Sequence, residues 1–319
     1  MSTTGLRIGG AAVGVVMGAV FIAQAAFVST ARRSQSPQDE WLASPVDDQT
    51  FRTYLDFFAY DPDVAFDIHV IAEEEQDGIR KEHLSFQSTP GVRVFANYYR
   101  PIAGIQGRPA ILLLHGGEPG GKDSRSIQVL ADALVRGGFN VLAIDFLYYG
   151  ERKTDLLSTF ANQEKAQRLY NQPSLYLTWI AQSVKDAGRA FDLLVREKGA
   201  DAEHVGLVGF SRGAQVGSIV GAADQRFAVV AMLYGGHFDA LETGHRPAAC
   251  PANYIGRISP RPLLMINGTL DSDYDKEISV EPLQRLAREP VTILWAETQH
   301  SIPPQEFRAA LVEWLRENL

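Results

Sequence analysis

The sequence predicts an α/β fold in which a mostly parallel central sheet is flanked by helices. Short, continuous apolar runs recur along the chain, and such runs are typical of strands that are covered on both faces. Stretches with helical spacing separate these runs. A regular alternation of strand and helix indicates a parallel sheet with helices on its faces.

The expected elements follow in chain order. A short aromatic helix is expected at Phe51–Phe58, and alternating residues predict two antiparallel strands, Leu84–Gln87 and Val92–Tyr99, joined by a turn at 89–91. The apolar runs predict strands at Ala110–Leu114, Val141–Ile144, Val205–Val208, Ala228–Leu233, Leu263–Ile266 and Val291–Trp295. The stretches between them predict helices at Ser126–Arg136, Val184–Glu197, Arg212–Ala222, Ser279–Arg288 and Pro304–Leu315.

The N-terminal part predicts a separate segment and a linker. Ile8–Val28 is an uncharged stretch of 21 residues between Arg7 and Arg32, long enough to span a bilayer as an anchor. A cleaved secretory signal ending near 23–25 explains it equally well. We therefore expect a signal peptide or membrane anchor at 1–33, a linker and N-terminal extension at 34–80, and a folded domain at 81–319. The protein is expected to be membrane-anchored or exported, with the side of the membrane left open.

Composition narrows the classes of partner. The 319 residues are 45% hydrophobic and carry a formal net charge of -8 without a basic stripe, which disfavours nucleic acid. Cys250 is the single cysteine, so no internal disulfide is possible. The sequence has no spacing typical of a metal site, and we expect neither a metal nor a cofactor.

A serine between two glycines carries the strongest chemical signal. The segment Gly209-Phe210-Ser211-Arg212-Gly213 follows an apolar strand and opens a helix rich in small residues. This is the context of a nucleophile elbow, where the serine occupies a sharp, strained turn and larger neighbours would collide with the strand or the helix. Ser211 is the predicted nucleophile, and the Arg212 amide at the helix start is a predicted oxyanion donor.

A glycine loop after an earlier strand supplies the second predicted oxyanion donor. His115-Gly116-Gly117 directly follows the apolar run that ends at Leu114. Glycines let the backbone turn its amides towards a developing oxyanion. Gly117 is the preferred donor and Gly116 the next candidate, while His115 is expected to brace the loop.

The base and the acid are expected after the serine in chain order. His300 is the only histidine downstream of the candidate acids, on a loop after the last predicted strand, and it is the predicted base. Asp271 lies just beyond the strand Leu263–Ile266 and is the predicted acid, with Gly268 expected to allow the exit turn. Asp273 and Asp275 are rivals in the same loop, expected to lie in the cap region of the next helix.

The order Ser211, Asp271, His300, together with the elbow and the glycine loop, resembles the α/β-hydrolase superfamily over about Leu84–Leu319. Within it the chain is similar to the bacterial acetyl xylan esterase and dienelactone hydrolase-like branch. The cues are Tyr98–Pro101, Asp186–Ala190 and Gly268–Asp271. The resemblance implies that 81–319 is an α/β-hydrolase catalytic domain. The elbow has a serine where dienelactone hydrolases have cysteine and dehalogenases have aspartate, so those activities are not expected.

We therefore expect a serine esterase that acts on a short acyl ester, and the resemblance implies acetyl on a carbohydrate. The alternatives are a serine peptidase resembling the prolyl oligopeptidases, and a non-catalytic protein on a hydrolase fold. About 80 residues precede the expected core, too few for the propeller domain of those peptidases. The complete set of three side chains argues against a non-catalytic protein.

Other residues are candidates for contact with the substrate. Tyr148 and Tyr149 follow the strand Val141–Ile144 and are expected to line the acyl pocket, although core packing is an alternative for one of them. The side chain of Arg212 is expected either to form a salt bridge or to meet an acidic group of the substrate. The interval at 150–180 is the expected place for a small cap, because it carries four aromatic residues: Phe160, Tyr170, Tyr176 and Trp179.

Overall fold

The computed structural model describes residues 40–103, 107–242 and 246–319. The hydrophobic segment Ile8–Val28 lies outside these residues, so its assignment as a signal or an anchor stays a prediction. Within the described part of the chain, no helix combines the length and the apolar character needed to cross a membrane.

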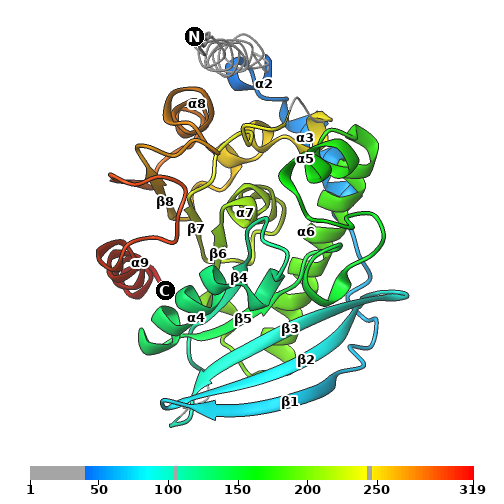
Figure 1. Ribbon diagram of the computed structural model, residues 1–319, viewed down its shortest axis with the longest axis vertical. Coiled ribbons are helices and arrows are strands. Elements are labelled where there is room, and N and C mark those ends of the chain that lie inside the picture. The colour runs from blue at the N-terminus through cyan, green and yellow to red at the C-terminus, as the bar shows by residue number, and fades with distance from the viewer. Residues whose placement is uncertain (1–39, 104–106, 243–245) are drawn as a thin grey trace, which may run out of the picture. The chain divides into compact units, whose positions relative to one another are not determined.

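Nine strands of the described residues form one sheet in the order β1-β2-β3-β5-β4-β6-β7-β8-β9. The first three strands and β5 pair antiparallel, and all pairs from β5 to β9 are parallel (Figure 1). The strands are β1 (His69–Gln76), β2 (Ile79–Thr89), β3 (Val92–Pro101), β4 (Ala110–Leu114), β5 (Asn140–Ile144), β6 (Val205–Phe210), β7 (Val229–Leu233), β8 (Leu263–Gly268) and β9 (Val291–Ala296).

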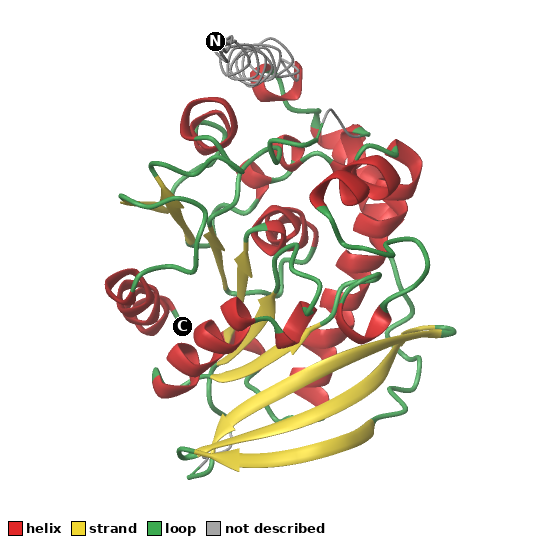
Figure 2. Ribbon diagram, viewed as in Figure 1, coloured by secondary structure: helices red, strands yellow, loops and turns green. Residues whose placement is uncertain are grey.

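Helices cover both faces of this sheet (Figure 2). The α-helices of the described residues are α2 (Glu40–Ala43), α3 (Asp48–Leu55), α4 (Arg125–Arg136), α5 (Asn162–Lys165), α6 (Pro173–Arg196), α7 (Arg212–Ala223), α8 (Glu281–Gln284) and α9 (Gln305–Asn318). Leu112 packs with α6 and α7, whereas its neighbours Ile111 and Leu113 pack with α4 and α9. Alternate residues of one strand thus enter two separate cores, which explains why the parallel strands are continuously apolar.

The strand order brings distant loops to one edge of the sheet. β4 lies between β5 and β6, and Leu114 at the end of β4 pairs with Gly209 near the end of β6. The chain proceeds from β4 to β5 in one direction and from β6 to β9 in the other. The crevice at such a switch point, beyond the carboxyl ends of the strands, is where α/β sheets bind their ligands.

The structure confirms the predicted mixed sheet and departs from the sequence prediction in several elements, among them β2, which begins at Ile79 instead of Leu84. β1 lies within 34–80, the stretch expected to be linker and extension, and all its residues are exposed, so no apolar pattern marks it. α6 begins at Pro173, well before the expected start at Val184. In place of one helix at Ser279–Arg288, a π-turn at Lys276–Val280 leads into the short α8.

Candidate active site

Ser211 occupies a strained turn between β6 and α7. Its φ is 55° and its ψ is -118°, a backbone conformation that is costly for any residue with a side chain. A Cβ on Gly209 would lie 2.2 Å from the carbonyl oxygen of Gly213, and one on Gly213 would lie 2.2 Å from that of Leu114. The two glycines are therefore required by close backbone approach, as the elbow pattern predicts.

The glycine loop lies directly against this turn. A Cβ on Gly116 would be 3.1 Å from the Cβ of Ser211. The N–H of Gly117 has no acceptor among the described residues, and the N–H of Arg212, the first residue of α7, has none within the helix. Two N–H groups beside the turn that carries Ser211 thus have no acceptor within the described hydrogen bonds, as the predicted oxyanion role requires.

His115 fixes the orientation of this loop. Its Nδ1 is 2.6 Å from the carbonyl oxygen of Gly116, and its Nε2 is 3.0 Å from the backbone nitrogen of Phe146. Because the amide of Phe146 must donate, Nε2 accepts and Nδ1 carries the proton. Burial lowers the pKa of His115, which keeps it neutral in this role. The Gly116 carbonyl and the Gly117 N–H belong to one planar peptide, so His115 also sets the direction of that N–H.

His300 connects the serine to Asp271. Its Nε2 lies 2.8 Å from Oγ of Ser211, and its Nδ1 lies 2.8 Å from Oδ2 of Asp271. The other oxygen of Asp271 accepts the backbone N–H groups of Asp273 at 2.8 Å and Tyr274 at 3.0 Å. The carboxylate is therefore held by three hydrogen bonds, with its side chain fully buried.

A close backbone approach brings acid and base together. The N–H of Thr269 donates to the carbonyl oxygen of Ala296 at 2.8 Å, and the N–H of Leu270 donates to the carbonyl oxygen of Thr298 at 3.0 Å. A Cβ on Gly268 would lie 2.4 Å from the carbonyl oxygen of Thr298. Gly268 is thus needed because the loops after β8 and β9 touch here, rather than for the exit turn expected from the sequence, since its φ is not positive.

The two rival aspartates have different places. Oδ1 of Asp275 accepts the N–H groups of Glu277 and Ile278, so Asp275 caps the turn that follows, as expected. Asp273 does not: its carboxylate is half-exposed and lies 4.0 Å from Nε2 of His300. The structure therefore pairs Nδ1 of His300 with Asp271 and leaves Asp273 beside the other ring nitrogen.

Charge around His300 raises its pKa. Burial alone would lower it, but the hydrogen bond and the charge of Asp271, with the charges of Asp273 and Asp239, outweigh burial and raise the pKa of His300 above its ordinary 6.5. Phe210 stacks against the ring, with centroids 5.9 Å apart. The imidazole is thus fixed in position, and its protonated form is stabilised relative to that of a free histidine.

A cavity of about 470 Å³ opens onto Ser211 and His300. Its walls come from the elbow, the glycine loop, the loops after β7, β8 and β9, the start of α4, and four residues of the interval at 150–180: Phe160, Asn162, Lys165 and Tyr170. The interval expected to hold a small cap therefore forms one wall of the cavity.

The two tyrosines predicted to line the acyl pocket do not lie on this cavity. Tyr149 is fully buried, packs on His115 with ring centroids 5.3 Å apart, and hydrogen-bonds the hydroxyl of Tyr170. Tyr148 has a φ of 72°, so the turn directs its side chain differently from that of an extended residue. Tyr170, one of the aromatic residues of the interval, lines the cavity instead.

The side chain of Arg212 is buried in a network of its own. Its guanidinium bonds Glu242 and lies 3.2 Å from Asp239, and the ring of Tyr170 stacks on it at 3.9 Å. Of the two expectations for this side chain, the salt bridge is the one that the structure contains.

The chain is similar to known proteins in its structure. No family model and no curated protein matches the chain. A cold-adapted esterase from an Arctic intertidal metagenomic library superposes with a TM-score of 0.61 at 23% identity, covering 78% of this chain and 98% of the esterase. Acetyl xylan esterase 1 from Thermoanaerobacterium sp. gives 0.64 at 16% identity, covering 88% and 98%. An acetyl xylan esterase from Paenibacillus sp. gives 0.64 at 13%, covering 89% and 100%.

The chain has the α/β-hydrolase fold. This confirms the fold inferred from the sequence resemblance, and acetyl xylan esterases are among the similar structures, as the resemblance implied. At these identities the likeness establishes the architecture alone. In this fold, Ser211, Asp271 and His300 follow strands β6, β8 and β9, at the carboxyl edge of the sheet.

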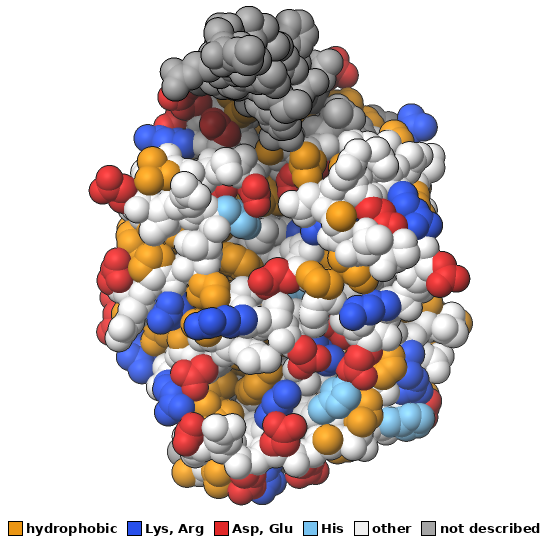
Figure 3. All heavy atoms as spheres, in the orientation of Figure 1, with side chains coloured by type: hydrophobic (Ala, Val, Ile, Leu, Met, Phe, Trp, Pro, Cys, Tyr) orange, Lys and Arg blue, Asp and Glu red, His pale blue; other side chains and the backbone are white. Residues whose placement is uncertain are grey.

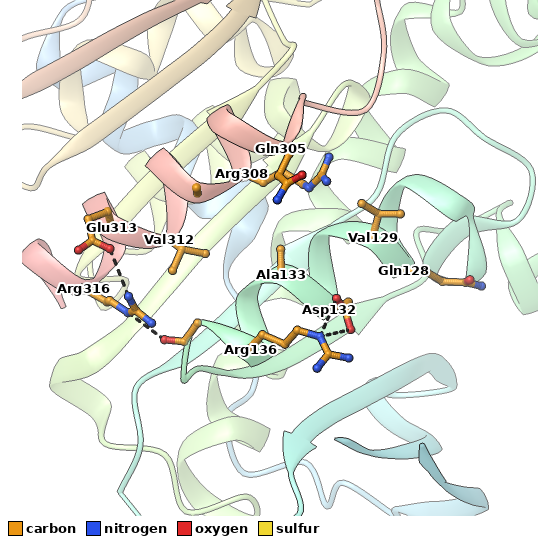
Figure 4. A pocket seen from close by; sticks show the side chains of 12 residues that line it. Gln128, Val129, Asp132, Ala133, Arg136, Gln305, Arg308, Val312, Glu313 and Arg316 are labelled. Atoms are coloured by element: carbon orange, nitrogen blue, oxygen red, sulfur yellow. Dashed lines mark hydrogen bonds and ion pairs between the residues drawn. The ribbon is translucent and has the colours of Figure 1, made fainter. Parts of the chain in front are cut away.

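A second hollow of the structure, about 600 Å³, lies between α4 and α9 (Figure 4). Four of its charged side chains are paired, Arg136 with Asp132 and Arg316 with Glu313, and Arg308 donates to the carbonyl of Pro303. None of the predicted site residues lines it. On the face shown in Figure 3, basic and acidic side chains are interspersed without a continuous patch of either sign. Among the described residues, no group of three His, Cys, Asp or Glu side chains is arranged to hold a metal.

Sequence reasoning missed Lys165 and Asp239 as cavity residues. Lys165 is buried, and its Nζ donates to the carbonyl of Gly117 at 2.8 Å. Its only signal was its place in the aromatic interval at 150–180, and no spacing rule assigns a lysine there. Asp239 follows β7 at the same edge of the sheet, a position that the strand prediction alone would have flagged.

Proposed function

We propose that the protein is a serine hydrolase that cleaves carboxylic esters of short acyl groups through an acyl-enzyme. The observation that carries the proposal is the continuous chain of hydrogen bonds from Oγ of Ser211 through His300 to Asp271, with 2.8 Å at each step. The similar solved structures named above are esterases, which supports the same reaction class.

In the proposed mechanism, Oγ of Ser211 attacks the ester carbonyl while Nε2 of His300 takes its proton. Asp271 holds the imidazole with its proton on Nδ1 and stabilises the imidazolium that forms. The N–H groups of Gly117 and Arg212 bind the oxyanion, and each is worth roughly 3 to 4 kcal/mol in such sites. His300 then protonates the leaving alcohol, and a water activated by the same nitrogen releases the acid.

The cavity supports a polar leaving group. Glu118, Asp239 and Asp273 place carboxylates on its walls, and Asn162 and Ser126 add further polar groups. Carboxylates accept hydrogen bonds from hydroxyl groups, so an alcohol with several hydroxyls finds acceptors around Ser211. We therefore include acetyl esters of carbohydrates in the proposal as the natural substrate class.

A panel of esters and amides tests this function. The protein is expected to hydrolyse p-nitrophenyl acetate and acetylated sugars faster than long-chain esters, and a fluorophosphonate is expected to label Ser211. Aminoacyl p-nitroanilides should react far more slowly. The absence of both turnover and labelling would exclude a serine hydrolase, and faster cleavage of the anilides would favour the peptidase alternative.

The pH dependence of kcat/KM should report His300. Only the neutral imidazole accepts the serine proton, so kcat/KM is expected to rise with pH through the raised pKa of His300, with its inflection above 6.5. Asp273→Asn removes one of the charges that raise this pKa and should move the inflection to lower pH. Asp275→Asn, at the cap, is the control and should leave it in place. An acid limb below 6.5 in the wild type would contradict the assignment.

A further inference from the structure

Residues 162–172, here called the brace segment, contact both oxyanion donors. Lys165 donates to the carbonyl of Gly117 at 2.8 Å, and the ring of Tyr170 lies 3.9 Å from the guanidinium carbon of Arg212. A π-turn at Ala166–Tyr170 follows α5. Its widened i→i+5 spacing puts Lys165 and Tyr170 on the same side of the segment. One short segment therefore holds the two residues whose N–H groups are the proposed oxyanion hole.

The geometry around Gly117 shows how closely it is held. Nζ of Lys165 donates to the carbonyl oxygen of Gly117, in the peptide group between Gly117 and Glu118. Nδ1 of His115 donates to the carbonyl oxygen of Gly116, in the peptide group between Gly116 and Gly117. A Cβ on Gly117 would lie 3.4 Å from Nζ of Lys165 and 3.5 Å from the hydroxyl of Tyr170. The glycine is thus fixed through both of its peptide groups, and the brace segment supplies one of these constraints.

Lys165 is unusual among the buried cations of this protein. It is 8% exposed and forms no ion pair with any residue that the structure describes, whereas the buried Lys122 pairs with Asp123, Asp145 and Glu151. Desolvation lowers the pKa of Lys165 and Arg212 adds to the effect, while the charges of Asp239, Asp273 and Glu118 oppose it without forming an ion pair with Lys165. Burying an ammonium without a carboxylate is costly. The one hydrogen bond described for Nζ of Lys165 goes to the carbonyl of Gly117 in the glycine loop, so this cost is linked to that contact.

The brace segment also forms hydrogen bonds with parts of the protein other than the glycine loop. The side-chain amide of Asn171 donates to the carbonyl of Leu241 at 3.0 Å, beside the loop that carries Asp239 and Glu242. These two carboxylates are the partners of Arg212. The hydroxyl of Tyr170 bonds that of Tyr149, beneath the cavity. The segment is thus fixed to the loops on either side of Ser211.

We propose that Lys165 and Tyr170 are positioning residues of the oxyanion hole, which hold the N–H groups of Gly117 and Arg212 at the geometry of the transition state. This inference rests on the proposed function. It predicts that the brace segment affects the chemical step rather than the affinity for the ground-state ester, because an oxyanion exists only after attack.

The test uses the full chain and separates kcat from KM. Lys165→Met keeps the length of the side chain and removes its donor. It is expected to lower kcat for p-nitrophenyl acetate about 10- to 100-fold with KM changed by less than about threefold. Lys165→Gln retains a donor and should recover part of the loss. Gln163→Met, exposed on the same helix, is the control and should behave as the wild type.

Tyr170 is tested by a conservative pair of variants. Tyr170→Phe keeps the ring over Arg212 and should lose less kcat than Tyr170→Leu, which should lose about as much as Lys165→Met. Thermal unfolding of each variant shows whether the fold persists. Because Tyr170 is deeply buried, the result for Lys165→Met decides the proposal if Tyr170→Leu does not fold.

A transition-state analogue supplies the second readout. A trifluoromethyl ketone accepts Oγ of Ser211 at its carbonyl carbon, the proton passes to His300, and the carbonyl oxygen becomes an oxyanion. Its affinity should fall in parallel with kcat in Lys165→Met. An active wild type with unchanged kcat and ketone affinity in Lys165→Met overturns this inference alone. A wild type that neither turns over esters nor binds the ketone overturns the proposed function and this inference with it.

Discussion

Replacing Ser211 with alanine is expected to abolish ester hydrolysis, with kcat falling on the order of 10⁶-fold. The hydroxyl lies 2.8 Å from Nε2 of His300, and no other described hydroxyl occupies that position. The variant cannot form the acyl-enzyme, because it lacks the attacking hydroxyl. Any remaining activity should therefore come from the oxyanion hole and substrate binding alone. Initial rates with p-nitrophenyl acetate and labelling by a fluorophosphonate measure the loss.

Ser301→Ala is the matched control for Ser211→Ala. Ser301 lies on the same cavity and next to His300 in the chain, but it is exposed and makes no contact with the elbow in the hydrogen-bond network described. Both variants should unfold at the temperature of the wild type, since Ser211→Ala leaves the backbone turn and both flanking glycines in place. Substantial turnover by Ser211→Ala would show that another group is the nucleophile.

Asp271→Asn is expected to retain the fold and to lower kcat about 10⁴-fold. Oδ1 of Asp271 accepts two backbone N–H groups, from Asp273 and Tyr274. In the variant the amide oxygen must occupy that position, so the NH₂ group faces Nδ1 of His300. An amide donor there stabilises the tautomer with its proton on Nε2, which cannot accept the proton of Ser211.

Asp273→Asn and Asp275→Asn provide the comparison for Asp271→Asn. Asp273 lies 4.0 Å from Nε2 of His300 and acts on the imidazole through its charge alone. Asp275 caps the turn that follows. Both should lose far less activity than Asp271→Asn, as measured by kcat at a pH well above the pKa of His300. If Asp273→Asn were the crippling change, the orienting carboxylate would be Asp273.

Residues that depend on local backbone chemistry could be predicted from the sequence. Gly209 and Gly213 mark the elbow because no side chain fits at either position, and Gly116 marks the other side because it lies closely against Ser211. The predicted apolar runs coincide with the parallel strands, since burial on both faces leaves a continuous pattern. Together these features placed Ser211, His300 and Asp271 at one edge of the sheet.

Residues whose position depends on tertiary packing could not be predicted. Tyr148 has a positive φ, which a sequence does not announce at tyrosine, and the side chain of Tyr149 is directed inward instead of towards the cavity. Lys165 reaches Gly117 only because the π-turn and α6 dock the segment there. β1 has no buried face, so its strand conformation is set by its hydrogen-bonded pairing with β2, which no apolar pattern in the sequence marks.

The positions of the three side chains along the chain also set the order in which the proposed site is assembled. Ser211 follows β6, whereas His300 follows β9, the outermost strand at that side of the sheet. During synthesis the nucleophile and both oxyanion donors are therefore made well before the base. A nascent or truncated chain that ends before β9 carries a serine with no group to accept its proton. In the proposed mechanism, activity therefore requires β9, the last strand of the described residues, to have joined the sheet.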